Sequence, residues 1–129
     1  MKKSTFLLLI GIVWSWCGIA QVAIGVQDGT TSAMPISGLW EYSYSQQIVT
    51  QSEINAGGDI TSISFFFTSG TNTAPSTKWR IYLGHTSKIQ FSSTSDWVLG
   101  SELDEVFDGI VTFPAVGNQM LITFVLPVL

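Results

Sequence analysis

Four carboxylates lie close together in the sequence, at Glu102, Asp104, Glu105 and Asp108. A pair of carboxylates can supply the acid and the base of glycoside hydrolysis, and carboxylate oxygens can hold calcium. The spacing does not match a calcium-binding loop, and we expect no bound metal or cofactor. The cluster is therefore interpreted as a solvated acidic turn. A weak calcium site at Asp104, Glu105 and Asp108 and glycan-cleaving chemistry over residues 102–108 are the alternatives.

The chain has one histidine, His85, and any histidine-based mechanism must use it. As a general base it would need an orienting acid and a nucleophile nearby, and the sequence identifies neither. The sequence also lacks phosphate-cradling glycine loops, nucleophile elbows and zinc-ligand spacings. We therefore interpret His85 as a hydrogen-bonded residue where a strand meets a turn, and we predict that the protein is not an enzyme.

A series of aromatic residues, Trp40, Tyr42 and Tyr44, precedes Gln46 and Gln47. Aromatic rings can stack on the C–H face of a pyranose while amides bind its hydroxyls. Trp40, Tyr42, Tyr44 and Gln46 could therefore form a glycan-binding face. Tyr42 and Tyr44 would also share one face of a β-strand, and aromatic side chains commonly belong to a core. We expect the aromatic series to pack into or over the core, with the glycan face as the alternative.

The strongest pattern in the chain is an alternation of apolar and polar residues with a period of two, which is typical of half-buried β-strands. It predicts a strand over residues 78–83 with Trp79 in the core, whereas Trp97, in a polar stretch, could belong to the core or to the surface. The other predicted strands cover residues 60–68, 107–113 with a bulge at Gly109, 42–49, 120–126 and, more weakly, 23–26.

One segment departs from the strand pattern. Thr50 and Glu53 have the spacing of a capping box and predict a short helix over residues 51–56, which Gly57 would end in a left-handed conformation. The short strands and polar turns around it predict an all-β fold in which two antiparallel sheets form a β-sandwich of the jelly-roll or immunoglobulin type. Residues 21–129 show no repeat or linker and are predicted to form a single domain.

The N-terminus predicts export. Two lysines precede an apolar run over residues 6–14, and small residues follow at Gly18 and Ala20. This order is typical of a helical signal peptide, here residues 1–20, with cleavage between Ala20 and Gln21. The apolar run is shorter than the roughly 20 residues of a transmembrane helix. We expect the mature protein to have no membrane segment and to reach the periplasm, then the cell surface or the medium.

Removal of the leader would change the composition of the chain. The full sequence has 5 basic and 9 acidic residues, and the leader takes Lys2 and Lys3 with it. Such an acidic chain favours neither nucleic acid nor an anionic membrane as a partner. The only cysteine, Cys17, also belongs to the leader. The mature chain would therefore have no disulfide, thiol nucleophile or thiolate ligand.

Several segments occur together, and in the same order, in a known kind of domain. They are PISGLWEYSYSQQI (35–48), SEINA (52–56), ITSISF (60–65), WRIYLGHT (79–86), STSDW (93–97) and VFDG (106–109). The series resembles a β-sandwich module found in large secreted proteins of Gram-negative bacteria that use type IX secretion, and it covers most of residues 24–124. Such modules lie beside fibronectin-like, peptidase or glycan-active domains, often with a C-terminal sorting domain.

On this basis we expect a non-catalytic accessory module that acts in adhesion, spacing or weak glycan contact, with a glycan or another surface protein as partner. A small glycan-active enzyme or its remnant is the alternative. In the family, further strands follow the segment similar to residues 120–124, so we expect a truncated, frame-shifted or fragmentary domain here. Met120, Ile122 and Phe124 would then lie on an exposed sheet edge open to self-association.

Overall fold

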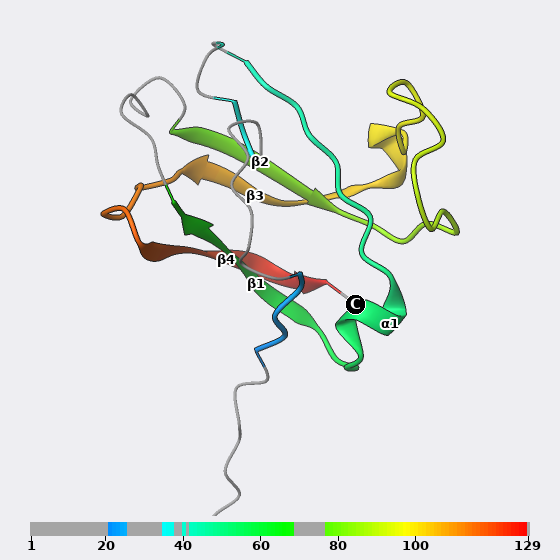
Figure 1. Ribbon diagram of the computed structural model, residues 1–129, viewed down its shortest axis with the longest axis horizontal. Helices are drawn as coiled ribbons and strands as arrows, with labels where there is room; N and C mark the ends of the chain where they lie inside the picture. Colours follow the sequence, from blue (N-terminus) through cyan, green and yellow to red (C-terminus); the bar gives the residue numbers. More distant parts are fainter. Residues whose placement is uncertain (1–20, 26–34, 38–39, 41, 69–76, 129) are drawn as a thin grey trace, which may run out of the picture.

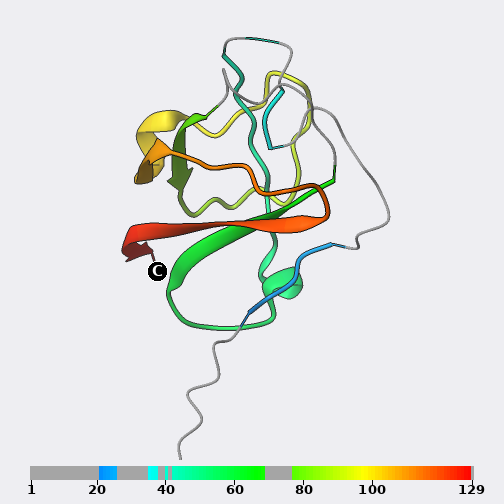
Figure 2. The same ribbon diagram turned by 90° about the vertical axis from the view of Figure 1, so that its left-hand side faces the viewer.

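The computed structural model describes residues 21–25, 35–37, 40, 42–68 and 77–128, with side chains described as far as Val125. This part of the chain consists mainly of β-strands, arranged in two antiparallel sheets of two strands each. The strand pairs are β1 (Ile60–Phe67) with β4 (Asn118–Val128), and β2 (Lys78–Leu83) with β3 (Asp104–Ile110). The β1–β4 sheet lies below the β2–β3 sheet in both Figure 1 and Figure 2. The predicted all-β class is confirmed.

The inner face of the β1–β4 sheet carries much of the core. Ile63 lies opposite Ile122 and Phe65 opposite Met120, so the apolar positions of the two strands share one face. Met120, Ile122 and Phe124 keep only 5%, 3% and 7% of their surface exposed. The expected exposure of these three side chains is therefore wrong, and Met120 and Ile122 belong to the same cluster as Trp79 of the other sheet. Among the described strands β4 pairs only with β1, so its backbone does lie at a sheet edge.

Trp79 on β2 is the aromatic centre of the core, as its place in the alternation predicts. Its ring lies edge-on to Phe65 of the other sheet and to Phe113, with centroids 6.1 and 6.0 Å apart. The pairing of β2 and β3 continues just beyond both strands, where the Val111 N–H donates to the Thr77 carbonyl at 2.7 Å. The two sheets therefore share one apolar cluster.

The bulge in β3 is at Val106 rather than at Gly109, where the sequence predicts it. Ile81 pairs with Phe107 and the next residue of β2 pairs with Glu105, so Val106 is the extra residue. Gly109 pairs regularly with Trp79. A Cβ at Gly109 would come within 2.9 Å of the Phe107 ring. The glycine therefore makes room for that ring instead of bending the strand.

The predicted helix is shorter than expected and ends differently. In α1 (Gln51–Ile54), the predicted capping box is present, and its bond from the Thr50 N–H to Glu53 Oε2 measures 2.7 Å. The Thr50 hydroxyl donates to the same oxygen at 2.7 Å. The bond from the Thr50 N–H lowers the pKa of the Glu53 carboxyl. The left-handed residue that ends the helix is Asn55, with φ 44°, and not Gly57. Asparagine tolerates this conformation because its short polar side chain can bond locally.

Two of the predicted strands are not found. Residues 42–49 form no strand, and neither do residues 23–25, the described part of the weak strand near the N-terminus. The 42–49 segment is extended and runs along the loops (Figure 1). Side-chain hydrogen bonds attach it there in place of a backbone ladder, and one of them runs from Ser45 Oγ to the Pro35 carbonyl at 2.6 Å. Residues 1–20, the predicted leader, lie outside the described residues. No helix in the described ranges is long and apolar enough to cross a membrane.

Candidate functional site

Three aromatic side chains form a cluster at the surface, which we call the aromatic cluster: Tyr44, Phe91 and Trp97. The Trp97 ring centroid is 5.2 Å from that of Tyr44 and 6.2 Å from that of Phe91, and both pairs are tilted. Tyr44 remains 61% exposed and Trp97 44% exposed. The cluster is therefore packed well enough to hold its rings in place while it offers ring surface to solvent.

Beside the aromatic cluster lies a shallow depression of about 120 Å³, which we call the aromatic hollow. Its lining residues combine two rings with hydroxyl, amide and carboxylate groups: Gln46, Phe91, Ser93, Thr94, Asp96 and Trp97. All but Gln46 come from the segment between β2 and β3. Ligand sites characteristically combine apolar walls with a few converging polar groups.

Gln46 attaches the 42–49 segment to the loop that carries Trp97. Its Nε2 donates to the Val98 carbonyl at 2.8 Å, and its Oε1 accepts from the Val98 N–H at 2.9 Å. The side-chain amide thus pairs with both backbone groups of one residue, as a neighbouring strand would. Nε2 also lies 2.6 Å from the Tyr44 hydroxyl, to which it donates. Gln46 therefore positions Tyr44 against Trp97, and its amide is already engaged.

Asp96 fixes the other side of the aromatic hollow. Its Oδ1 bonds to the Lys88 ammonium, and its Oδ2 accepts from the N–H and the hydroxyl of Ser92, both at 2.8 Å. The bond with Lys88, followed by those with Ser92, holds the pKa of the Asp96 carboxyl far below its usual range. Asp96 is therefore an ionised structural anchor for residues 88–96, and its negative charge is balanced by Lys88.

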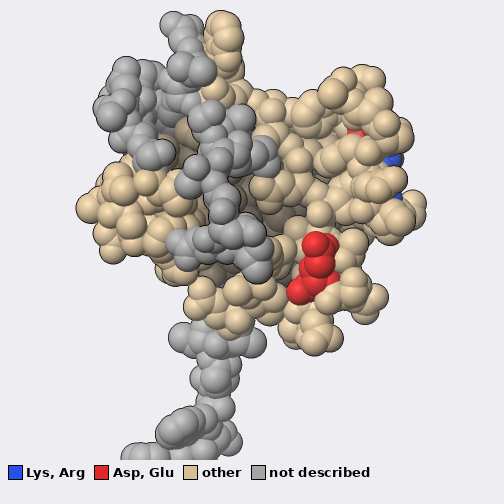
Figure 3. Space-filling view, viewed as in Figure 1, with Lys and Arg blue, Asp and Glu red and all other residues tan. Residues whose placement is uncertain are grey.

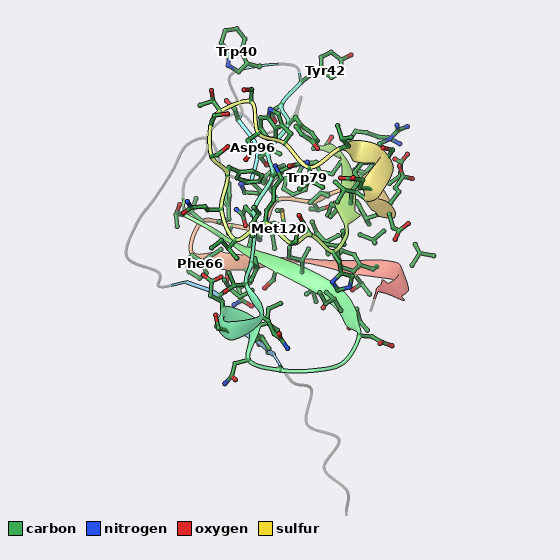
Figure 4. All side chains as sticks on the ribbon, turned by 90° about the vertical axis from the view of Figure 1, so that its right-hand side faces the viewer. Trp40, Tyr42, Phe66, Trp79, Asp96 and Met120 are labelled. Atoms are coloured by element: carbon green, nitrogen blue, oxygen red, sulfur yellow. The ribbon has the colours of Figure 1, made fainter. Side chains whose placement is uncertain are left out.

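Trp40 and Tyr42 are 71% and 90% exposed. Figure 4 shows both rings at the outer end of the molecule, whereas Trp79 and Met120 lie inside it. The expectation that the aromatic series packs into or over the core is therefore wrong. Residues 42–49 pair with none of the described strands, so their alternation does not create an inward face. Of the four residues of the predicted glycan face, Gln46 lines the aromatic hollow and Tyr44 belongs to the adjacent aromatic cluster.

Sequence reasoning did not assign Phe91, Ser93, Thr94, Asp96 or Trp97 to a site. The available signal was the presence of two large aromatic residues within a Ser- and Thr-rich loop. Such rings have no strand face on which to be buried, so exposure is their default. The link to Gln46 spans 52 positions in the sequence and could not be predicted from local spacing.

The acidic residues of β3 belong to a different surface. Asp108 forms ion pairs with Lys78 at 2.6 Å and with Arg80 at 3.0 Å, and these contacts, Lys78 first, lower the pKa of its carboxyl. Glu105 accepts a bond from the Tyr82 hydroxyl at 2.8 Å, which raises the pKa of that phenol. These cross-strand contacts cover the outer face of the β2–β3 sheet, and neither carboxylate lines the aromatic hollow.

The other candidates from the sequence lie apart from the aromatic hollow. Glu102 is exposed in the short 3-10 helix η2 (Gly100–Glu102), and Asp104 is exposed at the start of β3. His85 is exposed in the loop two residues after β2 ends. Across the described ranges, no group of three or more His, Cys, Asp or Glu side chains is placed to hold a metal ion.

A second depression, of about 260 Å³, lies between the β3 end of one sheet and β4 of the other. It is lined by uncharged side chains: Phe107, Ile110, Val111, Thr112, Leu121, Ile122 and Thr123. Ile110 and Leu121 are 68% and 67% exposed. Its lining includes the hydroxyls of Thr112 and Thr123, but it has no tryptophan, amide or carboxylate, unlike the aromatic hollow.

Charged side chains are sparse on the face of the molecule shown in Figure 3, where most of the coloured surface carries no charge. No protein-family model matches the chain, and neither a similar curated protein nor a similar solved structure was found. The candidate function therefore rests on the geometry around Trp97.

Proposed function

We propose that this chain is a non-catalytic accessory module of a secreted or cell-surface bacterial protein, and that it binds glycans weakly through the aromatic hollow. The observation that carries the proposal is the exposed Trp97 ring, held between Tyr44 and Phe91 beside the hydroxyl groups of Ser93 and Thr94. A ring face that is fixed and exposed stacks on a sugar with little loss of side-chain entropy. Nearby hydroxyls bind the hydroxyls of the sugar.

The size of the aromatic hollow supports weak contact. Pockets that enclose a small-molecule ligand commonly measure about 300–1,000 Å³, whereas the aromatic hollow measures about 120 Å³. A ligand would be covered on one side only. Weak binding of this kind suits adhesion or spacing, where several modules or repeated ligands act together.

The wider setting is part of the same proposal. Residues 1–20 act as a cleaved leader that exports the chain to the periplasm, and the mature protein then reaches the surface or the medium. The two sheets belong to a β-sandwich of the type found beside other domains in proteins of the type IX secretion route. The order of segments along residues 24–124 and the shared core of the two sheets support this assignment.

A glycan array probed with the purified protein tests the proposal. We expect binding to a subset of glycans, loss of that binding in Trp97→Ala, and unchanged binding in Tyr82→Ala. Tyr82 is the matched control because it is also an exposed aromatic residue, but it lies on the outer face of the β2–β3 sheet. An array without signal, or a Trp97→Ala protein that binds as the wild type does, would overturn the proposal.

A further inference from the structure

We infer that the aromatic hollow selects a single uncharged pyranose unit and discriminates against both acidic and cationic sugars. The inference rests on the proposed function and specifies the class of ligand. It follows from how the charges around Trp97 are already paired, and from the small volume of the hollow.

Within the described part of the chain, an acidic sugar would find no unpaired cation at the aromatic hollow. Among the described residues that line the aromatic hollow, Asp96 is the only charged one. The nearest cation on its network, Lys88, is bonded to Asp96 Oδ1. A carboxylate on the ligand would have to displace that bond or remain unpaired beside Asp96, and either choice costs binding energy.

A cationic sugar would also gain little binding affinity from the charge of Asp96. The face of a tryptophan ring attracts cations, and a carboxylate beside the ring would add to that attraction. Here the charge of Asp96 is balanced by Lys88, and both oxygens of the carboxylate are already bonded, one to Lys88 and the other to Ser92. The ammonium of Lys88 would repel a second ammonium nearby.

An uncharged pyranose fits the groups that remain. Its C–H face can stack on Trp97, and its hydroxyls can exchange hydrogen bonds with Thr94 and Ser93, whose side chains are exposed at the rim. The Ser93 hydroxyl also contacts Ser95, at 3.2 Å from its hydroxyl and 3.3 Å from its N–H. The volume of about 120 Å³ suits one small ring rather than a chain of rings. Recognition would therefore concern a terminal or protruding sugar unit.

Titration by NMR at neutral pH tests the inference, with methyl glucoside, methyl galactoside and N-acetylglucosamine as uncharged probes, glucuronic acid as the acidic probe and glucosamine as the cationic probe. At least one uncharged sugar should bind roughly tenfold more tightly than either charged sugar, since unbalanced charge costs affinity. Its affinity should change less than about twofold when salt is raised, because no ion pair is screened. Tighter binding of either charged probe, or strong salt dependence, would overturn the inference.

The variant Lys88→Gln sharpens the test, with Lys78→Gln on the β2–β3 sheet as its matched control. Removal of Lys88 leaves Asp96 unbalanced, so affinity for glucosamine should rise several-fold in Lys88→Gln and stay unchanged in Lys78→Gln. An equal response of the two variants would contradict the role of the Lys88–Asp96 pair. Binding that depends on Trp97 but favours a charged sugar would refute the inference alone. If no sugar binds, the proposed function fails and the inference fails with it.

Discussion

Two tryptophans, Trp79 and Trp97, show how the same side chain serves different purposes in two regions of this molecule. Trp79 lies on β2, where strand alternation directs it inward, and it is 7% exposed. Trp97 lies in the loop between β2 and β3, contacts two other rings and is 44% exposed. The sheet region uses its aromatic residues for stability, whereas the loop region holds them at the surface.

Replacement of Trp79 should have the largest effect. Trp79→Ala removes the ring that contacts Phe65 and Phe113 across the core. Loss of a buried aromatic side chain costs about 3–5 kcal/mol of unfolding free energy. Urea denaturation would measure this, with Trp97→Ala as the comparison. If the two alanine variants lose the same stability, the distinction between the regions is wrong.

Removal of the Gln46 amide should have an intermediate effect. Gln46→Leu leaves the N–H and C=O of Val98 without their side-chain partner, and unsatisfied polar groups of this kind cost about 1–3 kcal/mol. Because Gln46 also positions Tyr44, we expect weaker glycan binding together with the loss of stability. The neighbouring Gln47, which is exposed, supplies the control Gln47→Leu. Equal denaturation curves for the two leucine variants would show that the contact with Val98 contributes nothing.

The anchor at Asp96 should appear in the pH dependence of stability. The pKa of its carboxyl is lowered in the folded state, so its contribution is complete above the unfolded pKa of about 3.9. That contribution decreases as the pH falls below this value toward the folded pKa. Asp96→Asn should therefore flatten the acid side of a plot of unfolding free energy against pH. Parallel curves for variant and wild type would contradict this role.

The ion pairs of the β2–β3 surface should matter least. Asp108→Ala removes the contacts with Lys78 and Arg80, but exposed ion pairs contribute little because water and salt screen them. We expect a smaller shift of the urea midpoint than in Gln46→Leu, and unchanged glycan binding. A loss of glycan binding in Asp108→Ala would show that the binding site lies on the acidic surface of β3 and not at the aromatic hollow.

The regular strands could be predicted from the sequence because alternation and burial agree there. Ile63 and Phe65 share the face opposite to Ser62 and Ser64, and they pair with Ile122 and Met120, so the local pattern and the packing agree. Tyr42 and Tyr44 alternate with serines in the same way, yet none of the described strands pairs with them. Alternation predicts a strand only where a partner is present, and the presence of a partner is a property of the whole fold.

Only part of the candidate site could be predicted from the sequence, for the same reason. Tyr44 and Gln46 were identified by residue type, but their partners Trp97 and Val98 lie far away in the sequence. A side-chain amide that replaces a strand partner leaves no periodic pattern. The position of the bulge at Val106 was likewise missed, because the glycine at 109 is required by the Phe107 ring.

The most direct test of the central claim observes both tryptophans in one experiment. The purified protein, labelled with 5-fluorotryptophan and assigned with Trp79→Phe and Trp97→Phe, would be titrated with a glycan selected from the array and followed by fluorine NMR. We predict that the Trp97 resonance shifts with saturation while the Trp79 resonance stays in place. A Trp97 resonance that does not move while the glycan binds would contradict the assignment of the site.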